Sequence, residues 1–228
     1  MEMNTLSSNN SEDKRKLVLF DLDGTLLNTI DDLSEAVNHA MQLRGFPLHT
    51  NVEYAMMVGN GVRNLVKRAL PEDQKEDDIL IDDALKDFKA YYTEHIDEHT
   101  IPYAGMQELL TQLHKDGVQV AVVSNKFQEG TERLIKKFFP DIPFVAILGN
   151  RPGFPLKPDP EIVLEVLRKT GIRKENVLMI GDSPTDMKTA ENGGIRGIAV
   201  SWGYRNMKDV PNLTVVDTAE EIYQLLSR

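Results

Sequence analysis

Two aspartates stand two residues apart, directly after a short apolar run. The run covers residues 17–20, and Asp21 and Asp23 follow it, with Gly24 next. Side chains at this spacing lie on the same side of an extended chain. Because two close carboxylates repel one another, a fold keeps them together where a cation or a shared proton compensates. Asp-Gly is also a strong turn signal, so this motif alone fits a catalytic site and an ordinary turn about equally well.

Polar groups suited to binding a phosphate follow a second apolar run and precede a predicted helix. Ser124 and Asn125 come after residues 118–123 and offer a hydroxyl and backbone amides to phosphate oxygens. Lys157 stands just before a helix opened by Pro160, where its charge would offset that of a phosphoryl group. Taken alone, each feature is better explained as a loop start or a surface lysine.

Two further carboxylates, Asp182 and Asp186, follow the apolar run 177–180 and lie one helical turn apart. Helix capping by Asp182 or Ser183 would explain them, with Asp186 near the positive end of the helix dipole. Capping does not exclude metal binding. Since several apolar runs lead into groups suited to the same phosphate, the sequence favours one shared site.

The elements that would position these groups alternate along the chain. The four strongest apolar runs are 17–20, 118–123, 177–180 and 197–200, and weaker ones are 144–148 and 213–216. Runs that are apolar at nearly every position are typical of parallel strands buried on both faces. Helical patterns over 106–113 and 160–170, followed by Gly117 and Gly171, lie between them. This order predicts an α/β fold with a doubly wound parallel sheet, which binds ligands at the carboxyl ends of its strands.

The stretch 28–100 interrupts the alternation. Apolar residues recur at helical spacing in three stripes, around Leu33, Leu65 and Phe88, without convincing strands between them. We therefore predict a small α-helical cap domain at 28–100, inserted into a core made of 16–27 and 101–228. The two crossings of the chain between core and cap would act as a hinge. Residues 1–15 are predicted to be a disordered tail.

In their order, these motifs resemble those of the haloacid dehalogenase superfamily: an aspartate pair, a Ser or Thr, a Lys and a final acidic cluster. The match covers nearly the whole chain after the tail and implies a Rossmann-like core. The details are most similar to the phosphoglycolate phosphatases of that superfamily, in the segments Val58-Gly59-Asn60-Gly61, Arg68-Ala69-Leu70, Ser124-Asn125-Lys126, Gly181-Asp182-Ser183 and Ser201-Trp202-Gly203-Tyr204-Arg205. One departure is Asn28-Thr29, where many relatives carry Asp before Thr or Ser.

The resemblance implies a mechanism with an aspartyl-phosphate intermediate. Asp21 would be the nucleophile, and Asp23 would act first as general acid and then as general base. Mg²⁺ would be held by the carboxylates of Asp21 and Asp182 and by the backbone carbonyl of Asp23. An all-oxygen ligand set argues against zinc. Asp186 would orient metal-bound water or Lys157.

The same resemblance assigns the groups that bind the substrate. Ser124, the Asn125 amide and Lys157 would hold the phosphoryl oxygens. Every candidate substrate shares the phosphoryl group, so discrimination must come from the cap. Asn60 and Gly61 are the predicted readers of the leaving group, because a glycine-flanked loop before a helix lets backbone approach a ligand closely.

The predicted activity is hydrolysis of a small phosphate monoester, with 2-phosphoglycolate favoured. A sugar-phosphate phosphatase, a pyrophosphatase or a β-phosphoglucomutase-like phosphotransferase of the same superfamily would use the same motifs. A receiver-like signalling domain is a more distant alternative. Such a domain would lack the helical insertion, and would hold its acidic pair and its phospho-accepting Asp on different strands.

Composition excludes several other classes. The 228 residues carry a formal net charge of -10, so a nucleic acid would meet net repulsion. There is no cysteine, which excludes disulfides, zinc-thiolate sites and cysteine nucleophiles. No secretory signal or membrane-length apolar run is visible, so we expect a cytoplasmic protein without a membrane partner, either a monomer or a homodimer.

Overall fold

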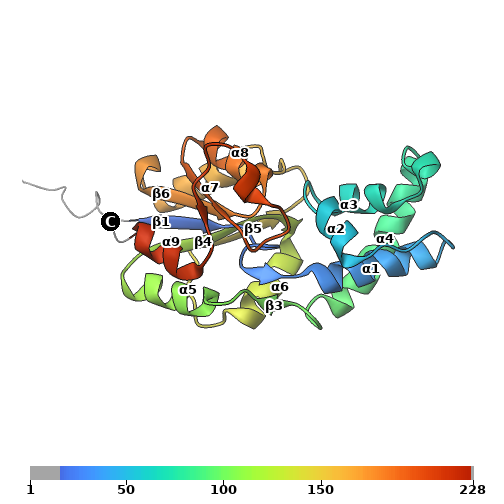
Figure 1. Cartoon of the computed structure of the whole chain (residues 1–228), viewed down its shortest axis with the longest axis horizontal. Helices are drawn as coiled ribbons and strands as arrows, with labels where there is room; N and C mark the ends of the chain where they lie inside the picture. Colours follow the sequence, from blue (N-terminus) through green and yellow to red (C-terminus); the bar gives the residue numbers. More distant parts are fainter. Residues whose placement is uncertain (1–15, 227–228) are drawn as a thin grey trace, which may run out of the picture.

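The computed structural model of the chain describes residues 16–226 and contains one sheet of six parallel strands (Figure 1). The strand order is β5-β4-β1-β6-β7-β8. The strands are β1 (Leu17–Phe20), β4 (Gln119–Phe127), β5 (Ala146–Asn150), β6 (Val177–Gly181), β7 (Arg196–Val200) and β8 (Val215–Val216). All six predicted runs are therefore strands. The predicted tail, 1–15, lies outside the described residues.

The first strand in the sequence lies at the centre of the sheet. Leu17 pairs with Gln119 of β4 on one edge and with Val177 of β6 on the other. All four residues of β1 are fully buried. This explains the unbroken apolar run, because a central parallel strand is covered on both faces. It also delivers Asp21 to the middle of the sheet's carboxyl edge.

Helices cover both faces of the sheet, as the doubly wound prediction requires (Figure 1). Val18 and Phe20 belong to the hydrophobic cluster that includes α5 (Met106–Lys115), α6 (Gln128–Phe138) and α9 (Ala219–Leu226). Leu17 and Leu19 belong to a separate cluster with α7 (Glu161–Thr170) and α8 (Pro184–Gly193). Alternate β1 side chains thus anchor the two helical layers.

Four helices make up a helical insertion at one end of the sheet (Figure 1). They are α1 (Ile30–Gln42), α2 (Asn51–Met57), α3 (Val62–Ala69) and α4 (Asp78–His95). Three further segments are 3₁₀ turns: Glu72–Gln74, Lys174–Asn176 and Met207–Asp209. Within residues 16–226, no helix combines the length and apolar character needed to cross a membrane.

The two chain crossings between insertion and sheet are tied together. Strand β2 (Leu27–Asn28) pairs antiparallel with β3 (Ile101–Pro102). Beside this pair, the buried carboxylate of Asp32 accepts hydrogen bonds from the backbone amides of His99 and Thr100, at 2.8 and 2.9 Å. The beginning and end of the insertion are therefore held side by side.

Candidate active site

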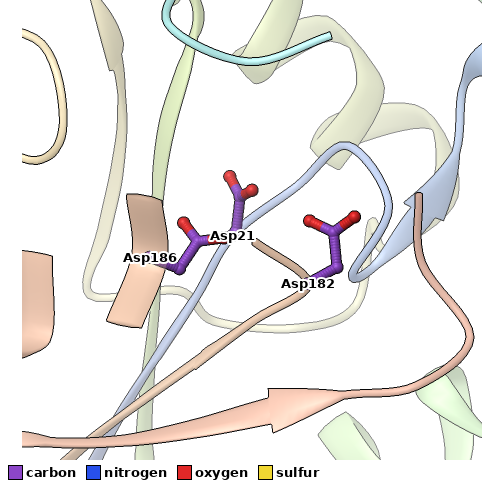
Figure 2. A group of neighbouring side chains, drawn as sticks. All are labelled: Asp21, Asp182 and Asp186. Carbon is purple, nitrogen blue, oxygen red and sulfur yellow. The ribbon is translucent and has the colours of Figure 1, made fainter. Parts of the chain in front are cut away.

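Three buried carboxylates gather at the carboxyl edge of the sheet (Figure 2). Asp21 directly follows β1, Asp182 directly follows β6, and Asp186 lies in the first turn of α8. Each offers an oxygen within 4.8 Å of the oxygens of the other two. Because β1 and β6 are parallel neighbours, their carboxyl ends place Asp21 and Asp182 next to each other.

The acidic centre is short of positive charge. Burial, together with the nearby charge of Asp186, raises the pKa of Asp21 from 3.8 to about 7, although Lys157 opposes the shift. Burial and the charges of Asp186 and Asp21 likewise raise the pKa of Asp182 well above its ordinary value. The site therefore disfavours three ionised carboxylates unless a cation joins them.

Lys157 is the cation that the fold itself supplies to this centre. Its ammonium lies 2.8 Å from Oδ1 of Asp21, donates to Oδ1 of Asp186 at 2.7 Å, and donates to the carbonyl of Val123 at 2.9 Å. Burial by itself would lower the pKa of Lys157, but the charges of Asp186 and Asp21 outweigh burial and raise it. Lys157 is therefore a charged group fixed at the nucleophile predicted from the sequence.

Asp186 combines helix capping with a contact to Lys157. Ser183, not Asp182, is the N-cap of α8, and the Asp186 and Ser183 side chains form a reciprocal capping box. Oδ2 of Asp186 accepts from the Ser183 backbone and hydroxyl at 3.1 and 2.6 Å, which leaves Oδ1 for Lys157. Both oxygens of Asp186 are thus engaged by the protein.

Two glycines allow the backbone to close around Asp182. A Cβ on Gly24 would lie 2.3 Å from Oδ2 of Asp182, and one on Gly203 would lie 2.2 Å from its Cβ. Gly24 also has a φ of +85°, which favours glycine. Oδ2 of Asp182 accepts a hydrogen bond from the Tyr204 amide at 2.7 Å. Any larger residue at either glycine would displace this carboxylate.

The second aspartate of the pair, Asp23, is oriented by two donors. Its Oδ1 accepts hydrogen bonds from the Thr29 hydroxyl at 2.7 Å and from the Lys126 ammonium at 3.0 Å. Lys126 also donates to the hydroxyl of Tyr92 on α4 at 2.5 Å. The Thr29 hydroxyl in turn lies 3.0 Å from that of Tyr204. Asp23 is thus connected to both the helical insertion and the loop after β7.

The predicted phosphate-binding pair lies inside β4, which continues to Phe127 with an irregular register after Val123. Ser124 is buried and lines the same cavity as Asp21. The side-chain amide of Asn125 exchanges two hydrogen bonds with the backbone of Lys157, at 3.0 and 2.8 Å. The Asn125 side chain therefore fixes the backbone of Lys157.

The predicted readers of the leaving group line the same cavity as the acidic centre. Gly59, Asn60 and Gly61 all have positive φ, at 114°, 61° and 84°, and all line the cavity together with Asp21. The Asn60 side chain meets the Thr185 hydroxyl at 3.4 Å. The loop between α2 and α3 is therefore sharply bent and lies against the sheet edge.

The acidic centre has the chemistry of a metal site. Its ligand atoms are all carboxylate oxygens, which hard divalent cations prefer. Within the described residues, Lys157 is the one cation that forms ion pairs with them. Both oxygens of Asp186 already accept hydrogen bonds from the protein.

Among the residues at the site that were not assigned a role from the sequence are Lys126, Tyr204 and Arg205. All three line the cavity. Alternation along β4 places Lys126 on the side of Ser124, a signal that was available. Tyr204 and Arg205 follow β7, where aromatic residues more often pack a domain edge, and their contacts are to residues far away in the sequence.

The chain is similar to known proteins in both sequence and structure. The family model of the haloacid dehalogenase-like hydrolases matches residues 18–200. The phosphoglycolate phosphatase of Mesorhizobium japonicum is 34% identical over 191 residues, which cover 83% of this chain and 84% of that protein. The phosphoglycolate phosphatase of Aliivibrio fischeri is 31% identical over 216 residues, which cover 93% of this chain and 95% of that protein. A crystal structure from Lactobacillus delbrueckii subsp. bulgaricus aligns with a TM-score of 0.87 at 32% identity, covering 93% of this chain and 98% of that one.

Proposed function

Because the chain belongs to the haloacid dehalogenase-like hydrolases, we propose that it hydrolyses a small phosphate monoester through an aspartyl-phosphate on Asp21, with 2-phosphoglycolate as its substrate. The observation that carries this proposal is the position of Asp21. It is buried at the centre of the sheet edge, with Lys157 at 2.8 Å and Asp182 beside it. A nucleophile, a cation and a metal-binding carboxylate thus converge on one point.

In the first half of the reaction, a carboxylate oxygen of Asp21 attacks phosphorus and forms a P–O bond. The bond from phosphorus to the leaving oxygen breaks in line, and Asp23 donates a proton to that oxygen. Lys157 and the backbone amide of Asn125 stabilise the charge on the phosphoryl oxygens, together with the Ser124 hydroxyl. The alcohol leaves with the proton from Asp23.

In the second half, water attacks the phosphorus of the aspartyl-phosphate. Asp23, now ionised, takes a proton from that water, and the bond from phosphorus to Asp21 breaks. Inorganic phosphate leaves, and both aspartates return to their starting states. The hydrogen bonds from Thr29 and Lys126 keep the Asp23 carboxyl oriented in both halves.

We propose Mg²⁺ as the metal ion. The carboxylates of Asp21 and Asp182 and the backbone carbonyl of Asp23 would hold it. Bound there, Mg²⁺ would neutralise negative charge on the carboxylates and on a phosphoryl oxygen. Asp186 would act indirectly, by fixing the ammonium of Lys157.

The helical insertion, residues 28–100, is proposed to serve as a cap that selects the substrate. Apolar residues of this segment, including Leu33, Val62 and Leu65, line the same cavity as the acidic centre. The space between them and Asp21 suits a small leaving group. The names of the relatives, phosphoglycolate phosphatases from two organisms, support glycolate as that group.

The test is a substrate panel with purified full-length protein and Mg²⁺. It should include 2-phosphoglycolate, several sugar phosphates, pyrophosphate and 4-nitrophenyl phosphate, with phosphate release as the readout. The Asp21→Asn variant is the matched control for contaminating phosphatase. We expect the highest kcat/KM for 2-phosphoglycolate.

If another ester has the highest kcat/KM, 2-phosphoglycolate is rejected as the substrate, but the proposed reaction still holds. Conversion of a sugar phosphate into its isomer, without phosphate release, would point to the phosphotransferase alternative. Equal phosphate release by the wild type and by Asp21→Asn would reject the mechanism.

A further inference from the structure

The loop that follows β7 contacts both the acidic centre and the helical insertion. At one end of this loop, the Tyr204 amide donates to Asp182 at 2.7 Å, and the backbone amide of Thr29 donates to the Tyr204 hydroxyl at 2.9 Å. The next residue, Arg205, donates to backbone carbonyls of the insertion more than 140 positions away in the sequence. One short loop thus joins Asp182, the start of the insertion and helix α2.

The loop itself is a fixed platform. The indole of Trp202 donates to the carbonyl of Thr25 at 3.2 Å. Gly203 packs so closely on Asp182 that a Cβ would lie 2.2 Å from the Cβ of that residue. Since the segment just before Arg205 is tied to the sheet edge, the guanidinium of Arg205 extends from the core and not from the insertion.

Arg205 binds the carboxyl end of α2. Its guanidinium donates to the carbonyls of Ala55, Met56 and Val58, the latter two at 2.8 and 2.7 Å. Carbonyls at the end of a helix have no partner within the helix and carry the negative end of its dipole. A cation from the core therefore binds the free carbonyls at the carboxyl end of α2.

A second arginine completes the arrangement from within the insertion. Arg68 on α3 donates to the carbonyls of Met57 and Gly59, at 2.5 and 3.2 Å. The five consecutive carbonyls 55–59 are therefore all bonded by these two guanidinium groups. Among the residues that the structure describes, neither arginine forms an ion pair with a carboxylate.

We propose that Arg205 is a positioning residue that holds the helical insertion closed over the acidic centre, so that the loop 58–61 forms the wall of the substrate cavity. The expected effect on catalysis rests on the proposed function. The closure of the insertion by Arg205 is independent of that function. The bonded carbonyls directly precede Asn60 and Gly61, which line the same cavity as Asp21. Release of α2 from Arg205 would therefore move the predicted readers of the leaving group.

The kinetic consequence follows from the population of the closed state. If only a closed protein binds the ester productively, the apparent KM equals the intrinsic value divided by the closed fraction. Without Arg205, a closed fraction reduced to about a tenth would raise KM about tenfold. The same chemistry would proceed once the site is closed, so kcat should stay within about threefold of wild type.

The test compares Arg205→Met with Arg63→Met as matched control. Arg63 lies on α3 and pairs with Asp78 and Asp82 of the insertion, so its loss removes an arginine without touching the core. Three quantities are measured in full-length protein. They are KM and kcat for the best ester of the panel, and the rate of hydrogen exchange of peptides covering 51–66. Peptides of α8 report on the core. Arg205→Lys keeps the charge with fewer donors and should give intermediate values; it also replaces Arg205→Met if that variant fails to fold.

We expect Arg205→Met to raise KM about tenfold with little change in kcat, and to speed exchange in 51–66 at least about tenfold while α8 is unchanged. Arg63→Met should match the wild type in KM, in the exchange of peptides that cover 51–58, and in the exchange of α8 peptides. An unchanged exchange rate in 51–66 would overturn the proposal, whatever happens to activity. Faster exchange with unchanged KM, or a fall in kcat alone, would also overturn it. If the wild type hydrolyses no ester, the proposed function fails, and exchange alone then decides whether Arg205 closes the insertion.

Discussion

Replacing the predicted nucleophile, Asp21, with asparagine should stabilise the metal-free fold, and the gain should grow with pH. The folded protein buries this carboxyl beside Asp186 and Asp182, with Lys157 as the cation shared among them. Asparagine is nearly isosteric and cannot ionise. The substitution therefore removes an unfavourable buried charge while it preserves the packing.

The size of the effect follows from the pKa of Asp21, which burial and the charge of Asp186 raise from 3.8 to about 7. Between these two values, the folded state binds more protons than the unfolded state, so the free energy of unfolding falls as pH rises. The slope is about 1.4 kcal/mol per pH unit and flattens above about pH 7. Between pH 5 and pH 8, Asp21→Asn should therefore gain about 2.5 kcal/mol over wild type. In the variant, Asp182 no longer lies beside the charge of Asp21, and this also increases the stability of the variant relative to wild type at high pH.

The assay is urea denaturation of both proteins in EDTA at pH 5, 6, 7 and 8. Asp141→Asn is the control, because it removes an exposed aspartate from the core surface. This control should stay within about 0.5 kcal/mol of wild type at each pH. Saturating Mg²⁺ should then reverse the order at pH 8, because a ligand that binds only the folded state stabilises it and the variant lacks one ligand.

A difference between Asp21→Asn and wild type that stays flat from pH 5 to pH 8 would refute this reasoning. It would mean that Lys157 compensates the charge of Asp21 fully in the absence of metal. A difference that shrinks as pH rises would show that the folded state favours the ionised carboxyl.

Three further predictions concern activity. Asp21→Asn should lower turnover more than about a hundredfold, a barrier increase of at least ~2.7 kcal/mol, and a smaller loss measured by phosphate release would reject Asp21 as nucleophile. EDTA should abolish activity, Mg²⁺ should restore it, and Ca²⁺ should compete without supporting turnover because it prefers longer bonds and more ligands; full activity in chelator would contradict the metal-dependent mechanism. Asn60→Leu combined with Gly61→Val should lower kcat/KM at least about tenfold for the best substrate but less than about threefold for 4-nitrophenyl phosphate. Equal losses for both substrates would argue that the cap does not recognise the leaving group.

Much of the fold could be predicted because its signals are local. The unbroken apolar run at 17–20 reflects burial on both faces, and most residues of the neighbouring strands β4 and β6 are buried as well. Helix α2 was not predicted, because Tyr54 is its one buried residue and a single position shows no periodicity. The pairing of β2 with β3 was also missed, since two-residue strands leave no pattern.

Only part of the candidate site could be predicted from the sequence, for the same reason. Asp21, Asp182 and Lys157 could be placed because each stands at the end of a recognisable run or directly before a helix, and parallel strands bring their carboxyl ends together. The partners of Lys126 are Asp23 and Tyr92, which lie far from it in the sequence. No spacing rule connects such residues. The contacts of Arg205 depend on how the insertion sits on the core, which the sequence alone does not specify.

The central position of β1 has a consequence for synthesis of the chain on the ribosome. Its neighbours, β4 and β6, lie more than a hundred residues further along. At roughly 5–20 residues per second, the ribosome makes β6 about ten to thirty seconds after β1. Until β6 is made, the four apolar residues of β1 lack at least one of their two partner strands, whereas the helices of the insertion already have their partners nearby in the chain.

A nascent chain that ends before Val177 therefore contains Asp21 but leaves β1 with an unpaired edge. Unpaired apolar edges are templates for association with other chains. Chaperone binding to residues 17–20 would protect the nascent chain at this stage. Completion of the sheet by β6 removes the exposed edge, and the same event brings Asp182 and Asp186 to Asp21.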